Sequence, residues 1–122
     1  MNTLKENPAD RRMIVNAWNP LDISKMALPP CHYSFQVTVT NEENDLNKIN
    51  LMWNQRSVDT MIGLPFNIAS YATMLHLLAK ETGFEEGKLT GFLGDTHIYK
   101  NHLKATEEQL SREPLPLPQI IT

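Results

Sequence analysis

The chain has 122 residues, which suits one domain with a modest core and is too short for two domains. Hydrophobic residues make up 41% and charged residues 20%, as in ordinary soluble proteins, and the formal net charge of −3 argues against binding nucleic acid through its phosphates. The single cysteine excludes an internal disulfide and a cysteine-rich metal site, so we expect no metal. The sequence has no apolar run that could cross a bilayer and no recognisable secretion signal, so the expected location is the cytoplasm.

The first half of the chain predicts strands. Residues 13–18 form a short apolar run that predicts a buried strand, and the prolines of residues 19–30 predict a loop. Residues 34–39 and 49–55 alternate between apolar and polar side chains, which predicts two half-buried strands. Their apolar residues are Phe35, Val37 and Val39 in the first strand and Ile49, Leu51 and Trp53 in the second. Residues 41–48 are charged and turn-forming, so we expect an exposed loop that joins the strands into a hairpin.

The second half predicts helices. Residues 65–82 carry an apolar stripe at spacings of three and four, with Gly83 placed as a C-terminal cap. The stripe consists of Ile68, Tyr71, Ala72, Leu75, Leu78 and Ala79. A shorter helix is expected over residues 101–112, stopped by Pro114, and the tail over 114–122 should run extended and end like an interrupted strand. Strands and helices follow one another without a βαβ rhythm, so the predicted class is α+β.

Five blocks of sequence carry the specific information. They are the early DRR and AWNP, MALPPCHYSFQ around Cys31, QRSVDTMIGLPFNIASY over residues 55–71, GDTHIYKNH over residues 94–102, and QLSREPLPLP over residues 109–118. In this order, and along nearly the whole chain, they resemble the thymidylate synthase family. The second of the long blocks, QRSxDxxxGxPFNIASY, is a family-restricted signature.

The resemblance implies both a fold and a reaction. The fold is a mixed sheet packed by helices, with one sheet face forming a homodimer interface, and residues 1–122 would be only its catalytic and dUMP-binding core. The reaction is a methyl transfer that converts dUMP to dTMP with 5,10-methylenetetrahydrofolate, giving dihydrofolate. In that family a thiolate adds to C6 of uracil, C5 becomes a carbon nucleophile, and the folate supplies the one-carbon unit and the hydride.

Cys31 matches the family nucleophile, although a lone cysteine is more often a small buried hydrophobe. Arg56 matches an arginine near this sulfur that also contacts the dUMP phosphate, and Ser57 would bind the same phosphate. Asp59 matches a residue of the nucleotide site that contacts the pterin ring of the folate. Gln55 lies beside these residues in sequence and is expected to support them.

Asn67 matches the residue whose amide contacts O4 and N3 of uracil, although an N-cap would be its ordinary explanation. Related enzymes that hydroxymethylate dCMP carry an aspartate there, so Asn67 favours uracil over cytosine. His97 and Tyr99 match the residues that bind the deoxyribose hydroxyl, and an extended segment would put both on one face. Arg11 and Arg12 match a pair that reaches the phosphate of the other subunit, although adjacent arginines are more often a solvated pair.

The other three histidines are weaker candidates for the site. His32 follows the nucleophile and invites a Cys–His dyad, but neighbours in sequence rarely face each other. His76 and His102 are interpreted as structural or surface residues. The glutamate that directs proton transfers in the family matches no residue of this chain, so the 122 residues alone are expected to be inactive.

Two alternatives stay open from the sequence. A dUMP hydroxymethylase of the same family would share these motifs, and the choice between methylation and hydroxymethylation rests on residues that match nothing here. A non-catalytic remnant could bind nucleotide or its own messenger RNA, or only dimerise. The role of the 41–48 loop, which is longer than in the common bacterial form, also stays open.

Overall fold

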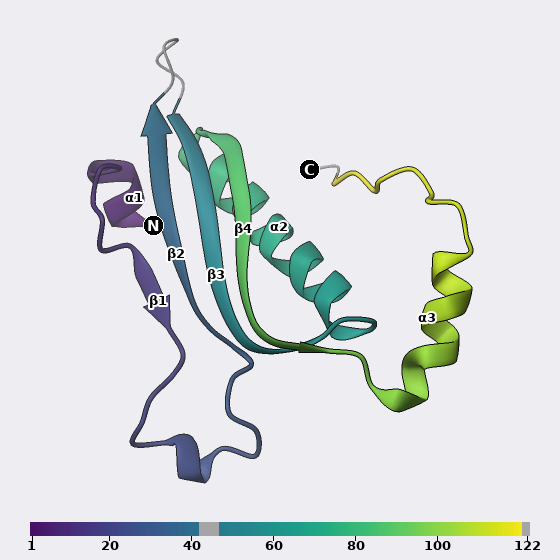
Figure 1. Cartoon of the computed structure of the whole chain (residues 1–122). Coiled ribbons are helices and arrows are strands. Elements are labelled where there is room, and N and C mark those ends of the chain that lie inside the picture. The colour runs from purple at the N-terminus through teal and green to yellow at the C-terminus, as the bar shows by residue number, and fades with distance from the viewer. Residues whose placement is uncertain (42–46, 121–122) are drawn as a thin grey trace.

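The computed structural model describes residues 1–41 and 47–120 (Figure 1). The elements in chain order are α1 (Asn2–Glu6), β1 (Ile14–Asn16), the 3₁₀ helix η1 (Ile23–Lys25), β2 (His32–Asn41), β3 (Asn47–Asp59), α2 (Gly63–Thr82), β4 (Glu85–His97), the 3₁₀ helix η2 (Lys100–His102) and α3 (Leu103–Leu110). The described strands form one sheet in the order β1-β2-β3-β4, antiparallel except for the parallel pair β3 and β4. This mixed sheet with helices confirms the predicted α+β class.

The predicted hairpin is present as β2 and β3. The two alternating apolar sets face each other across the ladder, because Val37 pairs with Leu51 and Val39 pairs with Ile49. The hairpin reaches further than predicted, since Asn41 still belongs to β2 and Asn47 already belongs to β3. Of the expected 41–48 loop, residues 42–46 lie outside the described residues.

The expectation that the chain has no βαβ rhythm is wrong for its second half. β3, α2 and β4 form a βαβ unit, in which α2 connects two parallel strands. The sequence hid β4 because this strand contains glycines and many charged or polar residues, which are poor strand signals. The glycines have a packing reason: a Cβ on Gly91 would lie 2.4 Å from the Trp53 ring, and one on Gly94 would lie 2.7 Å from the Arg56 carbonyl oxygen.

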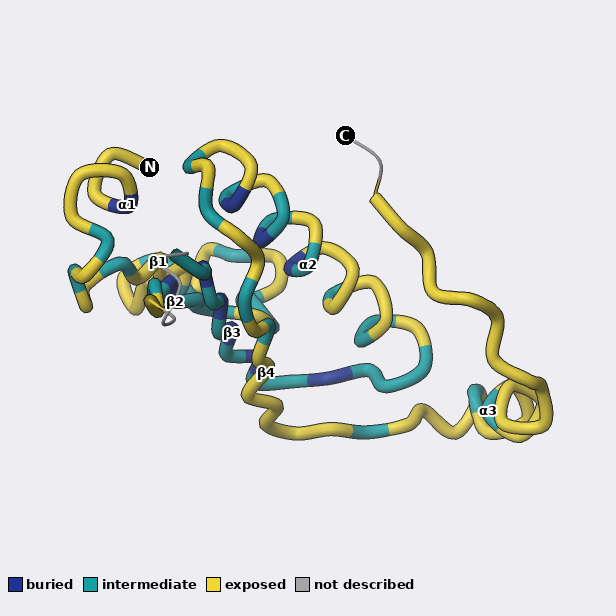
Figure 2. Tube along the Cα trace, turned by 90° about the horizontal axis from the view of Figure 1, so that it is seen from above, coloured by how far each residue is buried: buried dark blue, intermediate teal, exposed yellow. Residues whose placement is uncertain are grey.

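The core lies between the sheet and the helices α1 and α2, which cover the same side of the sheet (Figure 2). Its buried members are Leu4, Val37, Ile49, Leu51, Trp53, Tyr71, Leu75 and Ala79. The Tyr71 ring stacks on Trp53 with 5.1 Å between centroids, which fixes α2 against β3. The α2 stripe is therefore core as predicted, except for Ile68, which is 44% exposed. Gly83 has the predicted left-handed cap conformation, with φ at 74°.

Three predicted elements need correction. Residues 13–18 form only the short strand β1, which is exposed because it lies at the sheet edge, with Ile14 at 57% and Val15 at 52% exposure. Helix α2 begins at Gly63, two residues earlier than predicted, after the N-cap Ile62, so Asn67 lies inside the helix and is not its N-cap. The last helix is also shorter than 101–112, because residues 100–102 form η2 and α3 ends at Leu110.

The second face of the sheet has no helix packed over it in the described residues (Figure 2). This open face carries the polar side chains that alternate with the core residues of β2 and β3. Asn54 donates to the Ser34 hydroxyl at 3.0 Å, and Asn50 donates to the Thr40 hydroxyl at 3.2 Å, so cross-strand hydrogen bonds order the face. The described tail beyond α3 runs without regular structure up to residue 120, as predicted.

Candidate active site

Cys31 lies directly before β2 and is partly buried. Arg56, on β3, holds the chain at this point through three hydrogen bonds: its backbone N–H donates to the Cys31 carbonyl at 2.8 Å, its Nε to the Pro30 carbonyl at 2.9 Å and its Nη2 to the Pro29 carbonyl at 2.8 Å. The cysteine is thus fixed relative to the arginine that sequence analysis assigned to the same site.

The Arg56 guanidinium also borders an open hollow. It lies over the Trp18 ring at 5.7 Å from the centroid, and it lines a hollow of about 350 Å³ together with Asn16, Trp18 and Tyr33. A guanidinium has five N–H donors, and the contacts with the two proline carbonyls use two of them. Arg56 can therefore hold the loop before Cys31 and still offer donors to an anion.

The carboxyl ends of β3 and β4 bring a second group of predicted residues together. Ser57 pairs with Asp95 and Asp59 pairs with His97 in the parallel register. The Thr60 N–H donates to the His97 carbonyl at 3.0 Å, which continues the contact beyond the strand ends. In open parallel α/β sheets, ligands bind outside the carboxyl ends of the strands, and the single parallel pair of this sheet ends at the same kind of edge. The sequence predicted Ser57, Asp59 and His97 as site residues but not Asp95, and it did not predict the strand β4 that places them side by side.

Asp59 closes the turn from β3 into α2. Its Oδ1 accepts hydrogen bonds from the backbone N–H groups of Met61 at 3.1 Å and Ile62 at 3.3 Å. The imidazole Nδ1 of His102, which sequence analysis interpreted as structural or surface, lies 3.9 Å from the same oxygen. The Asp59 carboxylate therefore accepts hydrogen bonds from the turn that precedes α2, and the His102 side chain approaches it from η2.

His97 and Tyr99 lie close together, in line with the expectation that an extended segment puts them on one face. Their rings meet edge to face with 4.9 Å between centroids. His97 Nδ1 also lies 3.4 Å from an Asp95 carboxylate oxygen, and Tyr99 is largely exposed. Both side chains are accessible at the end of β4.

The buried amide of Gln55 is hydrogen-bonded to the partly buried amide of Asn67. Gln55 is only 3% exposed, and its Oε1 accepts a hydrogen bond from the Trp53 indole N–H at 3.1 Å. Its Nε2 donates to the Asn67 Oδ1 and to the Ser57 carbonyl, both at 3.1 Å. Because the Asn67 oxygen faces Gln55, its Nδ2 donor is turned away from that contact. The strand thus orients the amide of the helix.

His32 does not pair with the cysteine. Its Nδ1 lies 3.0 Å from the Tyr71 hydroxyl, and the two rings meet edge to face at 5.6 Å. Burial raises the pKa of Tyr71, so its hydroxyl stays protonated and can donate to the imidazole. The Cys–His dyad therefore has no support in the geometry.

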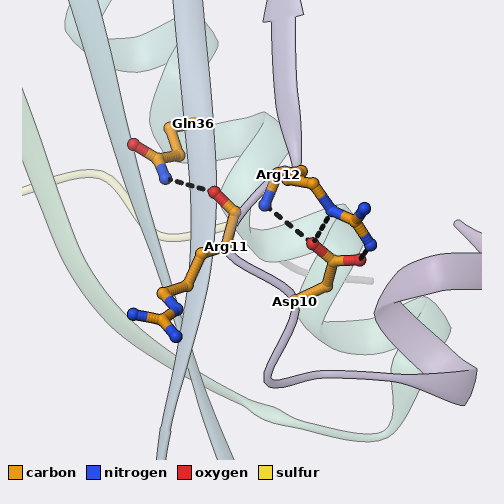
Figure 3. A network of polar contacts seen from close by, with 4 residues as sticks. All are labelled: Asp10, Arg11, Arg12 and Gln36. Atoms are coloured by element: carbon orange, nitrogen blue, oxygen red, sulfur yellow. Dashed lines mark hydrogen bonds and ion pairs between the residues drawn. The ribbon is translucent and has the colours of Figure 1, made fainter.

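Arg11 and Arg12 lie before β1 and their side chains point in different directions (Figure 3). Arg12 is 87% exposed, and its Nε and Nη2 donate to the Asp10 carboxylate at 3.0 and 2.8 Å. This fork lowers the pKa of Asp10 to about 2. The Arg11 carbonyl accepts a hydrogen bond from Gln36 at 3.2 Å, while its side chain is exposed. The described contacts do not join this pair to the residues around Cys31.

The described residues contain neither a candidate metal site nor a membrane-spanning helix. No group of three or more His, Cys, Asp or Glu side chains is placed to hold a metal ion there. None of the described helices is long and apolar enough to span a membrane.

Comparison with known proteins identifies the family. The family model for thymidylate synthase matches residues 1–122, which is the whole chain. The chain belongs to the thymidylate synthase family. Curated relatives include a probable thymidylate synthase of Escherichia phage T5, 52% identical over 118 residues, and the thymidylate synthases of Mycoplasma mobile, 54% over 119 residues, and Listeria monocytogenes serotype 4b, 49% over 118 residues.

These alignments cover 97%, 98% and 97% of this chain but only 41%, 40% and 36% of the respective relatives. The chain therefore spans about two fifths of the length of the thymidylate synthases that it matches.

Proposed function

We propose that this chain supplies the nucleophile and the dUMP-binding core of a thymidylate synthase, which converts dUMP to dTMP with 5,10-methylenetetrahydrofolate. One observation carries the proposal: β3 holds both key groups at once. Arg56 binds the chain beside Cys31, and the adjacent Gln55 binds the amide of Asn67. Neighbouring residues of one strand thus hold both Cys31 and Asn67, which supports the roles of nucleophile and base-reading amide proposed for them.

In this proposal the Cys31 thiolate forms a bond to C6 of uracil, and the electron pair of the C5–C6 double bond moves toward C5 and O4. The positive charge of Arg56 favours the thiolate and binds the substrate phosphate together with Ser57. The Asn67 Nδ2 donates to uracil O4, where negative charge develops. After C5 has gained the one-carbon unit and lost its proton, the bond from this carbon to the folate nitrogen breaks. Hydride transfer to the same carbon then restores the C5–C6 double bond and expels the Cys31 thiolate.

The folate supplies the one-carbon unit and the hydride that completes the methyl group, and leaves as dihydrofolate. The residues at the end of β3 suit such a ring, because the Asp59 carboxylate is an acceptor for ring N–H donors and a buried nitrogen of His102 lies beside it. His97 and Tyr99 would hold the deoxyribose hydroxyl.

The protein would act as a homodimer through the open face of the sheet, with Arg11 and Arg12 reaching the phosphate bound to the partner subunit. The exposure of both side chains supports this arrangement, and no described contact joins either arginine to Cys31 or Arg56. A symmetric pair of copies would place each arginine pair at the other copy's site.

The test is a covalent complex on Cys31. The natural gene product that contains residues 1–122 is mixed with 5-fluoro-dUMP and 5,10-methylenetetrahydrofolate, because fluorine at C5 blocks the proton loss that releases the cysteine. Mass spectrometry should find the nucleotide and folate together on the Cys31 peptide. The proposal fails if Cys31 stays unmodified, or if a Cys31→Ala variant still makes dTMP from dUMP. Formation of 5-hydroxymethyl-dUMP instead of dTMP would favour the hydroxymethylase alternative.

A further inference from the structure

His102 carries a buried ring nitrogen that needs a partner. Its Nδ1 is shielded from solvent and makes no hydrogen bond with the described residues. The backbone of His102 is held by two hydrogen bonds: its N–H donates to the Tyr99 carbonyl at 2.8 Å, and its carbonyl accepts from the Thr106 hydroxyl at 2.9 Å. The imidazole itself packs edge to face against the Tyr99 ring, with 5.6 Å between centroids. Buried polar atoms nearly always have a partner, so an orphaned one in a candidate site points to a function.

The nearest candidate partner is the Asp59 carboxylate. The 3.9 Å between His102 Nδ1 and Asp59 Oδ1 is an ion-pair distance, about 1 Å longer than a hydrogen bond. The same oxygen already accepts from the amides of Met61 and Ile62, which fix one side of the carboxylate. A carboxylate has about four lone-pair sites, so a third donor can still be accommodated.

We propose that His102 is a positioning residue for Asp59, whose carboxylate it fixes by donating its Nδ1–H. The inference rests on the proposed function, in which Asp59 contacts the pterin ring of the folate. The amides of Met61 and Ile62, in the turn before α2, hold the carboxylate from one side, and His102 approaches it from η2. With both restraints in place, the Asp59 carboxylate oxygens keep the orientation that the N–H donors of the pterin ring require. His102 thereby acts on folate binding and not on dUMP binding.

Three substitutions of His102 separate this role from simple packing. Asparagine places its amide nitrogen near the position of Nδ1, glutamine places it near Nε2, and phenylalanine keeps the ring contact with Tyr99 without a donor. In the natural gene product, His102→Asn should keep the KM for the folate within about threefold, whereas His102→Gln and His102→Phe should raise it about tenfold or more. The KM for dUMP should stay within about twofold in all three variants.

The proposal is overturned if His102→Asn is as impaired as His102→Gln, or if His102→Phe leaves the folate KM unchanged. An Asp59→Asn variant tests the underlying assignment separately: an unchanged folate KM there would remove Asp59 from the folate site, which is a failure of the proposed function. Thermal melting checks that each variant is folded.

A measurement on the unsubstituted protein does not depend on any variant folding. Nitrogen-15 NMR of the His102 imidazole, recorded with the folate bound, should show a protonated Nδ1 in hydrogen-bond contact with a carboxylate. An unprotonated Nδ1 in the folate complex would overturn the proposal as well.

Discussion

In the proposed function, Asn67 reads the base with an amide that a neighbouring residue orients. Its Oδ1 accepts a hydrogen bond from the Gln55 amide and keeps one further lone pair, while its Nδ2 donor faces away from Gln55 and can meet a ligand. A donor suits O4 of uracil, whereas cytosine carries an amino group at that position. Discrimination thus depends on two residues, of which only Asn67 would touch the base.

Asn67→Asp should therefore weaken the preference for dUMP. The carboxylate can still accept from Gln55 but has no donor for O4, so we expect kcat/KM for dUMP to fall about 100-fold or more, with dCMP discrimination reduced. Competition between dUMP and dCMP measures the change. Asn2→Asp is the matched control, because Asn2 is exposed on α1 and has no role in the proposed site, and it should leave the preference unaltered. An unaltered preference in Asn67→Asp would remove the base-reading role.

Asp10 gives a pH-dependent prediction at the same scale. Its pKa falls from 3.8 to about 2, first because of the side-chain hydrogen bond with Arg12. A lowered pKa in the folded state means that the pair contributes stability above about pH 4 and loses it as the pH falls through about 2. Carbon-13 NMR titration of the Asp10 carboxyl should give this value, and Arg12→Gln should raise it toward 3.8. A normal Asp10 pKa in the unsubstituted protein would contradict the fork geometry.

At the scale of elements, the sequence predicted those helices and strands whose apolar residues recur at a regular spacing. Apolar residues recur at every second position in β2 and β3 and at every third or fourth position in α2, because each element has one buried face. β4 has no such signal, since its packing against β3 depends on missing side chains at Gly91 and Gly94. The motifs named the residues at its end, but only the parallel pairing puts Asp59 beside His97.

The close packing at Gly91 predicts a large effect from one methyl group. Gly91→Ala would push the Trp53 ring, which is stacked on Tyr71 and bonded to Gln55. Overpacking of this kind costs about 1–3 kcal/mol, which urea unfolding should detect.

A double-substitution cycle supplies the control. The atoms that crowd Gly91 belong to the six-membered ring of the indole, which extends further from the backbone than the ring of Phe. Trp53→Phe should therefore remove most of the extra cost of Gly91→Ala. If the two substitutions destabilise additively, the contact between Gly91 and Trp53 is not what limits the packing.

At the scale of the whole molecule, the described residues expose apolar side chains that a small monomer would bury. Phe66 is 71% exposed on α2, and Leu115 and Leu117 are 86% and 89% exposed in the tail. The open face of the sheet adds a second surface without a helix in the described residues. Sequence alone did not distinguish these surfaces from core, because burial depends on which elements pack together and not on residue type.

A shared site between two copies predicts complementation. A Cys31→Ala variant and an Arg11→Gln/Arg12→Gln variant of the natural gene product should each make little dTMP, because every site in either homodimer lacks one component. After subunit exchange at equal concentrations, about half of the dimers are mixed, and one of the two sites in each mixed dimer regains both Cys31 and the arginines. Activity should then recover to about a quarter of the unsubstituted level. Exchange is followed independently by native mass spectrometry on subunits of different mass. If mixed dimers form and no activity returns, the arginines do not serve the partner's site, and the fork of Arg12 at Asp10 would have only a local structural role.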